Sequence, residues 1–402
     1  MITHHFSRLF GLEPSVEIRS PGRVNLIGEH TDYSLLPVMP LAIDRAVTLT
    51  GVGADDGRLI VESTTFPGII DIDLADLPAS VSGWHRYLVA AVRAVGADGP
   101  GARLLVGGDL PPTGGLSSSS AFTVGVIATL DRLWGLGLSR ADYPGIAIAA
   151  ERSIGVEGGM MDQTVIALAE RGHALRIDFD PPGHRQVPIP EGMGLVAAYS
   201  GSPAPKGGDA NLAYNTRVVA CRAAALLLGV PRGIDVTVPP VLSKIVAAGD
   251  VDLSGLAVET TAARVAAAID VDVELMVRMT AGRFDPDAPL PLAAVARHVV
   301  SEAGRVDRAE AAMNAGDLAD LGRLLDASHV SLQDFGASSP SLDTLVDAMR
   351  GAGAWGARLT GAGFGGYAVA VCPDASVDAV VEAAMEATGG PAFRVVASAG
   401  VG

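Results

Sequence analysis

Cysteine is scarce in this chain, because only two of its 402 residues, Cys221 and Cys372, are cysteines. They lie far apart and in no metal-binding spacing, so we expect two reduced, buried thiols and no disulfide-built secreted fold. Positive charge is also in short supply: 29 Lys and Arg against 45 Asp and Glu give a net charge of −16. This balance argues against nonspecific binding to nucleic acid or to an anionic membrane. It still allows a phosphate-bearing ligand, which a local nest of backbone N–H groups can hold.

Long apolar runs are absent as well. No segment approaches the roughly 20 apolar residues that cross a bilayer. Residues 1–11 include His4, His5 and Arg8 and lack the apolar segment of a signal peptide. We therefore expect a cytoplasmic protein.

The chain does have the apolar content for a sizeable core, with 49% hydrophobic and 18% charged residues. Its length suits two domains. A Pro/Gly-rich stretch over residues 178–192 marks the expected boundary, which gives an N-terminal domain of residues 1–185 and a C-terminal domain of residues 186–402.

Local patterns predict a mixture of strands and helices, and hence an α+β fold. β-branched or similar short runs indicate strands at residues 47–52, 58–62 and 102–106. Helical spacing predicts a helix at 118–133, a second from about 158 to 169, and others at 213–228, 292–312, 323–333 and 341–351. A strand pair around 358–359 and 366–371 brackets a glycine-rich turn.

A Gly/Ser loop, PPTGGLSSSS, occupies residues 111–120. Adjacent glycines allow consecutive N–H groups to point inward, and the N-terminus of the following helix adds unpaired donors and a positive dipole end. Serine hydroxyls are small enough to approach a phosphate or to ligate Mg²⁺. The loop lacks the lysine of a P-loop, and a Gly/Ser turn by itself is more often a structural helix cap than a phosphate site.

Three further segments carry polar or strained chemistry. Residues 22–33 (GRVNLIGEHTDY) set charged groups in an apolar frame, which suggests a cleft; a solvated loop is the alternative. Residues 151–163 place Glu151 and Asp162 at the ends of a glycine-containing link. Phosphoryl transfer needs a metal ligand, a group beside the acceptor hydroxyl and positive charge on the transferring group, and Glu151, Asp162 and Arg23 fit these needs. Alone, Asp162 would be interpreted as a helix-capping acid.

The third segment is the glycine-rich turn TGAGFGG at residues 360–366. Such glycine density costs backbone entropy and demands a close backbone approach or positive φ angles. Two explanations stay open: a tight hairpin, or a turn from the second domain that closes over an active site.

Together these segments resemble the motif set of the GHMP kinases, and most closely that of the galactokinases. The matching stretches are residues 22–33, 110–122 (LPPTGGLSSSSAF), 151–163 (ERSIGVEGGMMDQ), 213–222 (AYNTRVVACR), 328–346 and 359–366 (LTGAGFGG). The resemblance spans nearly the whole chain and is weakest between about residues 230 and 316. It implies a two-domain GHMP kinase fold, with an N-terminal domain like domain 2 of ribosomal protein S5 and the active site between the domains.

The resemblance also implies an ATP- and Mg²⁺-dependent enzyme that phosphorylates the anomeric hydroxyl of galactose. Its partners would be ATP and a small sugar, with no nucleic acid or membrane, and the chain would act as a monomer. Asp162 would accept the proton of that hydroxyl and Arg23 would stabilise the transition state; Ser119 and Glu151 would hold Mg²⁺. The sugar would contact Glu29, His30, Thr31, Asp32 and Tyr214. The triphosphate would lie on Thr113, Gly114, Gly115, Leu116, Ser117, Ser118 and Ser119.

Two stretches depart from the galactokinase pattern. Residues 34–37 (SLLP) replace the usual Asn and Gly-containing turn beside the sugar, and residues 199–212 carry added Pro and Gly. Residues 111–121 and 154–163 resemble the eukaryotic-type galactokinases and N-acetylgalactosamine kinases more than the common bacterial form. Two alternatives therefore stay open: a kinase for N-acetylgalactosamine or another pyranose or uronic acid, and a non-catalytic sugar sensor. The sensor is disfavoured because Arg23, Ser119, Glu151 and Asp162 are all present.

Overall fold

The fold is described from a computed structural model that covers residues 2–96, 99–112, 114–156, 159–203, 209–236, 240–249, 251–280 and 284–402. The helices of these residues are α1 (Ile2–Phe10), α2 (His85–Val95), α3 (Ser118–Trp134), α4 (Tyr143–Ser153), α5 (Met161–Leu168), α6 (Asp209–Gly229), α7 (Ser243–Ala247), α8 (Ala262–Ile269), α9 (Glu274–Val277), α10 (Leu292–Ala315), α11 (Leu318–Phe335), α12 (Pro340–Gly351) and α13 (Val377–Thr388). The strands are β1 (Val16–Ile27), β2 (Met39–Gly53), β3 (Arg58–Ser63), β4 (Ile70–Asp73), β5 (Ala102–Gly108), β6 (His173–Phe179), β7 (Pro182–Pro188), β8 (Met193–Tyr199), β9 (Thr260–Thr261), β10 (Pro289–Leu290), β11 (Gly356–Thr360), β12 (Tyr367–Pro373) and β13 (Ala392–Arg394).

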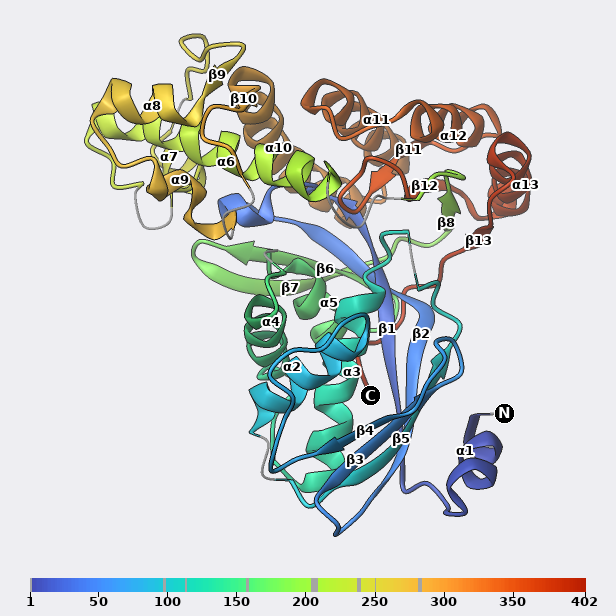
Figure 1. The fold of residues 1–402 in the computed structure, drawn as a ribbon. Helices are drawn as coiled ribbons and strands as arrows, with labels where there is room; N and C mark the ends of the chain where they lie inside the picture. Colours follow the sequence, from blue (N-terminus) through green and yellow to red (C-terminus); the bar gives the residue numbers. More distant parts are fainter. Residues whose placement is uncertain are drawn as a thin grey trace.

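A five-stranded sheet forms the first half, in the order β1-β2-β5-β3-β4. Its neighbours are antiparallel except for the parallel pair β3 and β5. Helix α3 packs on β1 and β2, and α2, α4 and α5 surround α3 (Figure 1). Most of one apolar core lies between this sheet and these helices.

A four-stranded antiparallel sheet, in the order β11-β12-β8-β13, forms the second half. Helices α11 and α12 pack on β11, and α13 packs on β8. Helix α10 lies against both α6 and α11, and a second apolar core fills this region. The long strands β1 and β2 run from the first sheet up to this half, so the carboxyl end of β1 meets α10 and β11 (Figure 1).

Most of the sequence-based elements are confirmed. The strands expected at residues 47–52, 58–62 and 102–106 lie in β2, β3 and β5, and the helix expected at 118–133 is α3. The four later helices correspond to α6, α10, α11 and α12, and the strand pair around the glycine turn is β11–β12. Cys221 and Cys372 are free and buried, as expected.

One expectation needs correction, and the stretch expected at the domain boundary has a defined structure. The helix expected from about residue 158 begins at Met161, as α5; residue 158 itself lies outside the described residues. The Pro/Gly-rich stretch over residues 178–192 is partly a strand, because β7 pairs with β6 in an antiparallel hairpin. Prolines and glycines are tolerated there because this two-stranded ribbon leaves edge positions that need no hydrogen-bond donor.

Across the described residues, no helix combines the length and the apolar character that a membrane span requires.

Candidate active site

A polar cavity of about 180 Å³ lies where the end of β1, the start of α3, the start of α5 and the turn after β11 come together. It collects side chains that are up to 339 positions apart in the sequence. Eight of the residues predicted to act at the site line it: Arg23, Glu29, His30, Asp32, Ser119, Glu151, Asp162 and Tyr214. Tyr33, Ser120, Gln163 and the turn residues Gly361 and Ala362 also line it.

Arg23 and Asp162 form the central ion pair of this cavity. The Nε of Arg23 donates to Asp162 Oδ1 at 2.7 Å, and its Nη2 donates to Oδ2 at 3.0 Å. The third guanidinium nitrogen, Nη1, donates to the carbonyl oxygen of Gly115 at 2.6 Å, and the hydroxyl of Ser117 also donates to Asp162. A bidentate pair of this kind fixes both side chains in direction. The contacts with Gly115 and Ser117 tie this ion pair to the Gly/Ser loop.

Glu151, at the end of α4, is buried behind the same loop. Its Oε2 accepts hydrogen bonds from Gln163 Nε2 at 2.8 Å and from the Ser120 hydroxyl at 3.4 Å. Its Oε1 is buried and has no hydrogen-bond partner among the described residues. Burial raises the pKa of Glu151 to about 7. A buried carboxylate oxygen without a partner is costly, so this atom is suited to a cation that arrives with a ligand.

Asp32 reaches the cavity from the turn that follows β1. Its carboxylate lies so close to Gly159 that a Cβ there would come within 1.5 Å of Asp32 Oδ2. The backbone N–H of Tyr33 donates to Oδ1 at 2.9 Å. Burial and, after it, the neighbouring charge of Asp162 raise the pKa of Asp32 to about 7. Shifted carboxyl groups that share a cavity are typical of functional sites.

Glu29 and His30 are both held by the second half of the chain. Glu29 Oε2 pairs with Arg358 Nη2 at 2.8 Å, and Arg358 is fully buried. Burial raises the pKa of Glu29, although Arg358 and Arg23 oppose this. His30 has its Nε2 3.1 Å from the Ala362 carbonyl oxygen and its Nδ1 3.2 Å from the Tyr33 hydroxyl. Burial lowers the pKa of His30 to about 3, which leaves a neutral ring.

Thr31 and Tyr214 have different surroundings. The Thr31 hydroxyl donates to the carbonyl oxygens of Gly28 and Pro37, each at 2.9 Å, and Thr31 is not among the residues that line the cavity. Its side chain therefore braces the turn. Tyr214, on α6, lies with its ring centroid 5.6 Å from His30 and 5.9 Å from Tyr33. Burial raises the pKa of Tyr214 well above 10, so its hydroxyl stays neutral.

The Gly/Ser loop leads from this cavity into a second one. Gly114 and Gly115 have φ angles of 108° and 97°, and Ser117 adopts a left-handed conformation with φ 58°. Non-glycine residues in this region are strained and cluster at functional sites. Leu116 is buried, the Ser118 hydroxyl donates to the Pro112 carbonyl oxygen at 2.8 Å, and Ser119 lines both cavities. Thr113 lies outside the described residues.

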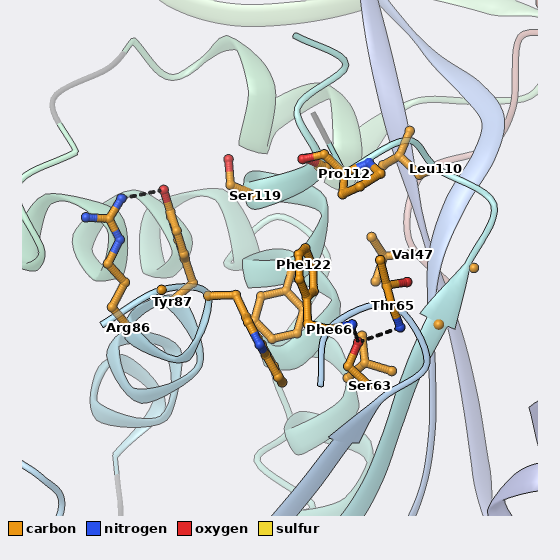
Figure 2. A pocket seen from close by; sticks show the side chains of 16 residues that line it. Val47, Ser63, Thr65, Phe66, Arg86, Tyr87, Leu110, Pro112, Ser119 and Phe122 are labelled. Atoms are coloured by element: carbon orange, nitrogen blue, oxygen red, sulfur yellow. Dashed lines mark hydrogen bonds between the residues drawn. The ribbon is translucent and has the colours of Figure 1, made fainter. Parts of the chain in front are cut away.

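The second cavity is larger, about 420 Å³, and its lining is mainly apolar and aromatic. Figure 2 shows Phe66, Tyr87 and Phe122 around it; Tyr87 lies on α2, Phe122 lies on α3 and Phe66 follows β3. The ring of Trp84 stacks with Phe66 at a centroid distance of 6.1 Å and meets Phe122 edge-on at 5.5 Å. The sequence analysis missed this cavity. Aromatic residues make up only 4% of the chain, so the closely spaced Trp84 and Tyr87, and Phe122 directly after the loop, were an available signal.

No three His, Cys, Asp or Glu side chains of the described residues come together as a metal cage. Mg²⁺ in phosphoryl-transfer sites is usually held by one or two carboxylates plus substrate phosphates. Glu151, with its unpartnered oxygen, fits binding of Mg²⁺ by one carboxylate together with substrate phosphates. The described residues do not fit a site in which protein side chains alone surround the ion.

Comparison with known proteins matches three parts of the chain. The galactokinase galactose-binding signature matches residues 4–51, the N-terminal domain of GHMP kinases matches residues 86–170, and their C-terminal domain matches residues 309–389. A galactokinase of Chloroflexus aurantiacus is 38% identical over 411 residues, covering 99% of this chain and 95% of that protein. One of Streptomyces coelicolor is 34% identical, with coverage of 99% and 97%.

Solved structures agree. The Lactococcus lactis galactokinase complexed with galactose superposes with a TM-score of 0.77 at 30% identity, covering all of this chain and 98% of that one. The Methanococcus jannaschii mevalonate kinase has a TM-score of 0.65 at 15% identity, over 95% and 98% of the two chains, which shows a shared fold.

Proposed function

Because the chain belongs to the galactokinase family of the GHMP kinases, we propose that it transfers the γ-phosphoryl group of ATP to the anomeric hydroxyl of galactose. The observation that carries this proposal is the pair of cavities that meet at Ser119: one apolar and aromatic, the other polar with the Arg23–Asp162 pair. Two adjoining cavities of opposite character suit two different substrates. We also propose that the reaction takes place between domains of residues 1–185 and 186–402, and in the cytoplasm.

ATP would lie with its base in the aromatic cavity, where Trp84 and Phe122 offer ring faces and edges. Base–aromatic stacking is favourable for any base. The triphosphate would follow the Gly/Ser loop toward Ser119, where the N-terminus of α3 supplies N–H donors and a positive dipole end. The γ-phosphate would then reach the polar cavity.

Galactose would occupy the polar cavity. The Asp32 carboxyl group, the Glu29 carboxylate and the Tyr214 hydroxyl are hydrogen-bonding groups of the kind that sugar hydroxyls need, and all three lie on residues of its lining. The turn residues Gly361 and Ala362 line the same space. We therefore favour the turn-over-the-site interpretation of the glycine-rich segment, which also forms the tight connection between β11 and β12.

Asp162 and Arg23 would carry the chemical step. The Asp162 carboxylate takes the proton from the anomeric hydroxyl while the anomeric oxygen of the sugar forms a bond to the γ-phosphorus. The bond from that phosphorus to the oxygen bridging to the β-phosphate breaks, and ADP leaves. Arg23, which already contacts Asp162 through two nitrogens, stabilises the charge on the transferring group.

Glu151, together with Ser119, would hold Mg²⁺. The fit rests on Glu151 Oε1, a buried acceptor with no partner among the described residues. When bound, the ion would neutralise charge on the β- and γ-phosphates. Glu151→Ala should raise the Mg²⁺ concentration needed for activity, while Glu170→Ala, which truncates an exposed acid, should not.

The proposal is tested by ADP release with ATP and Mg²⁺ against galactose, N-acetylgalactosamine, glucose, arabinose and galacturonic acid. We expect turnover of galactose well above that of the others. Preferred turnover of another sugar would keep the kinase chemistry and reject galactose as the substrate. ATP binding without turnover of any sugar would reject the enzyme and favour the sensor.

A further inference from the structure

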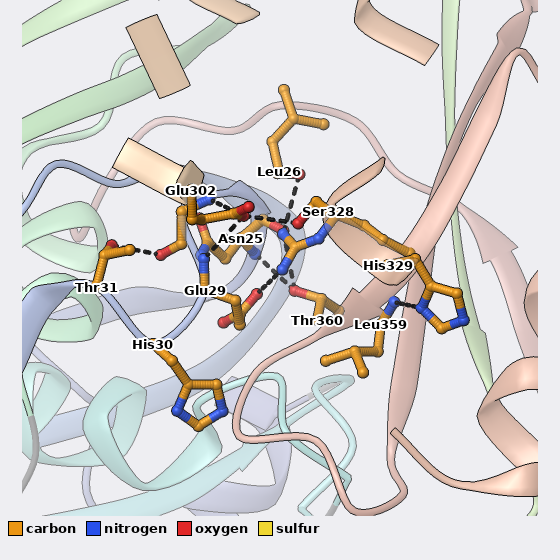
Figure 3. A network of polar contacts seen from close by, with 12 residues as sticks. Asn25, Leu26, Glu29, His30, Thr31, Glu302, Ser328, His329, Leu359 and Thr360 are labelled. Carbon is orange, nitrogen blue, oxygen red and sulfur yellow. Dashed lines mark hydrogen bonds and ion pairs between the residues drawn. The ribbon is translucent and has the colours of Figure 1, made fainter. Parts of the chain in front are cut away.

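The turn that carries Glu29 and His30 is held in place largely by one helix of the second half, α10. Glu302 on α10 accepts a hydrogen bond through Oε1 from the backbone N–H of Gly28 at 3.0 Å. One helical turn earlier, His298 Nε2 lies 3.0 Å from the carbonyl oxygen of Glu29. Two side chains four residues apart thus bind the N–H group of Gly28 and the carbonyl oxygen of Glu29. Figure 3 shows Glu302 beside Glu29 and Asn25.

The protonation state of His298 follows from its partners. A carbonyl oxygen only accepts hydrogen bonds, so Nε2 must carry the proton, and Nδ1 then accepts from the Ser331 hydroxyl at 2.8 Å. His298 is 1% exposed, and burial lowers its pKa to about 4, which keeps the ring neutral. Both ring nitrogens of His298 are therefore engaged, one with Ser331 and the other with the backbone of the turn.

Glu302 is completely buried yet charged. Burial would raise its pKa, but the charges of Arg358 and Arg305 and the Ser328 hydroxyl oppose burial and keep the pKa low. Arg305 Nε donates to Oε2 at 2.5 Å and Ser328 donates to Oε1 at 2.6 Å. A hydrogen bond from the Gly28 N–H to an ionised acceptor is stronger than one to a neutral group.

The turn needs such support because its backbone is unfavourable. Gly28 has a φ of 96°, and His30, which is not a glycine, has a φ of 60°. Left-handed backbone at a non-glycine residue is strained and persists only where the surroundings fix it. Here the surroundings are α10 together with Arg358, which binds the Glu29 side chain.

We propose that His298 and Glu302 are positioning residues for sugar recognition. They do not line the polar cavity; they hold the Gly28–His30 turn so that the side chains of Glu29 and His30 face it. This inference rests on the proposed function. It adds two residues that support sugar affinity, His298 and Glu302, which lie outside the galactose-binding signature of residues 4–51. It makes sugar affinity, and not ATP affinity, depend on α10.

The variants follow from the two contacts. Glu302→Gln keeps the side-chain shape but sets an amide NH₂ group against either Arg305 or the Gly28 N–H. His298→Leu removes the donor to Glu29, whereas His298→Gln can restore an N–H donor there. A displacement of about 1 Å can cost roughly 10²-fold in turnover, so we expect a loss of this order in kcat/KM for galactose in the first two variants. The KM for ATP should change less than about 2-fold, and His298→Gln should recover most of the loss.

Val299→Ala is the matched control, because it truncates a fully buried side chain on the same helix and removes no hydrogen bond. It should lower thermal stability without a selective effect on galactose. The positioning role is overturned if Val299→Ala lowers kcat/KM for galactose as much as Glu302→Gln does. It is also overturned if Glu302→Gln changes KM for ATP as much as KM for galactose. Should Glu302→Gln and His298→Leu not fold, Ser331→Ala, which removes only the Nδ1 partner of His298, should still raise KM for galactose selectively; no selective rise would overturn the proposal.

A second readout does not depend on activity. Amide hydrogen exchange in a peptide covering residues 26–33 should be faster in Glu302→Gln than in wild type, and unchanged in Val299→Ala. Unchanged exchange in Glu302→Gln would overturn the positioning role. If wild-type protein phosphorylates no sugar while the exchange result holds, the proposed function fails and the structural role of α10 stands.

Discussion

The two cavities of this molecule are built in opposite ways. The polar cavity draws its lining from residues 23 to 362 and needs both halves of the chain. The aromatic cavity draws its lining from residues 47 to 122 alone, all in the first half. The polar one contains carboxyl groups whose pKa values are raised, Asp32 and Glu151 to about 7. The polar cavity therefore costs stability and depends on how the two halves meet, whereas the aromatic cavity is lined by side chains of the first half alone.

The largest effect expected in the polar cavity comes from Asp162→Asn. The change removes the carboxylate that we propose as the proton acceptor and that Arg23 binds through two nitrogens. We expect kcat to fall roughly 10²–10⁴-fold, as for the loss of a general base. Steady-state kinetics with saturating ATP and galactose measure it, with Asp55→Asn, at an exposed turn, as the control. A kcat within a few-fold of wild type would show that Asp162 is not the proton acceptor.

The next effect tests how tightly the polar cavity is assembled. Gly159→Ala would bring a Cβ within 1.5 Å of Asp32 Oδ2 and so displace that carboxylate. We expect kcat/KM for galactose to fall by about 10²-fold. Gly145→Ala, in the exposed face of α4 with open space around it, should instead add about 0.5–1 kcal/mol of stability. Equal activity of the two variants would mean that the Asp32 carboxylate can move and that kcat/KM for galactose does not depend on its position.

The aromatic cavity should respond to Trp84→Ala through ATP alone. Loss of one stacking surface is worth about 1–3 kcal/mol for a bound base, so KM for ATP should rise about 10-fold or more while KM for galactose stays constant. Trp134→Ala is the control, because Trp134 packs against Gly99 and donates to the Gly101 carbonyl oxygen, away from the cavity lining. A rise in the galactose KM as large as that for ATP would erase the functional distinction between the two cavities.

The same distinction explains what the sequence could predict. Arg23, Glu151 and Asp162 lie in short motifs whose charged residues are unusual inside apolar frames, so their meeting at one cavity was predictable. Most helices and strands followed from local periodicity, including α3 behind its glycine loop. The site roles themselves stay predictions until variants are measured.

What escaped the sequence depends on tertiary packing. Trp84 and Phe66 are 18 residues apart and stack only after α2 packs against α3 and α4. Glu302 and His298 are one helical turn apart on a helix where the family resemblance is weakest, and nothing local marks them as partners of Gly28. Thr31 sits inside the sugar motif, yet its hydroxyl faces the backbone of its own turn. Sequence spacing gives no direction to a side chain in an irregular turn.

A smaller effect concerns Mg²⁺ and pH. Burial raises the pKa of Glu151 to about 7, and a metal ligand must be deprotonated. The carboxylate is therefore present above that pH and lost below it, so the half-saturating Mg²⁺ concentration should rise by up to about 10-fold per pH unit below 7. Titrations of activity with Mg²⁺ between about pH 5.5 and 8 measure this. Glu151→Gln should retain only the pH dependence that ATP itself brings; an unchanged profile would remove Glu151 from the metal site.

The smallest effect addresses the stability cost of the polar cavity directly. The pKa of Asp32 is about 7 in the folded chain against an ordinary value of 3.8, so the native state binds more protons than the unfolded state between these values. Stability contributed by this group therefore falls as pH rises through that window. Asp32→Asn removes the penalty, and we expect it to stabilise the ligand-free protein by about 1–2 kcal/mol at pH 8, after allowance for solvent in the cavity, and by almost nothing near pH 4.

Urea unfolding of both proteins at the two pH values measures the difference. The variant should at the same time lose activity toward galactose, because the carboxyl group is gone from the cavity. An equal stabilisation at both pH values would show that the pKa of Asp32 is not raised in the folded chain. Glu151 would then be the buried carboxyl group that lowers the stability of the polar cavity. Truncation in the aromatic cavity, by Trp84→Ala, should destabilise at every pH, since buried apolar contacts are lost there and no titrating group is relieved.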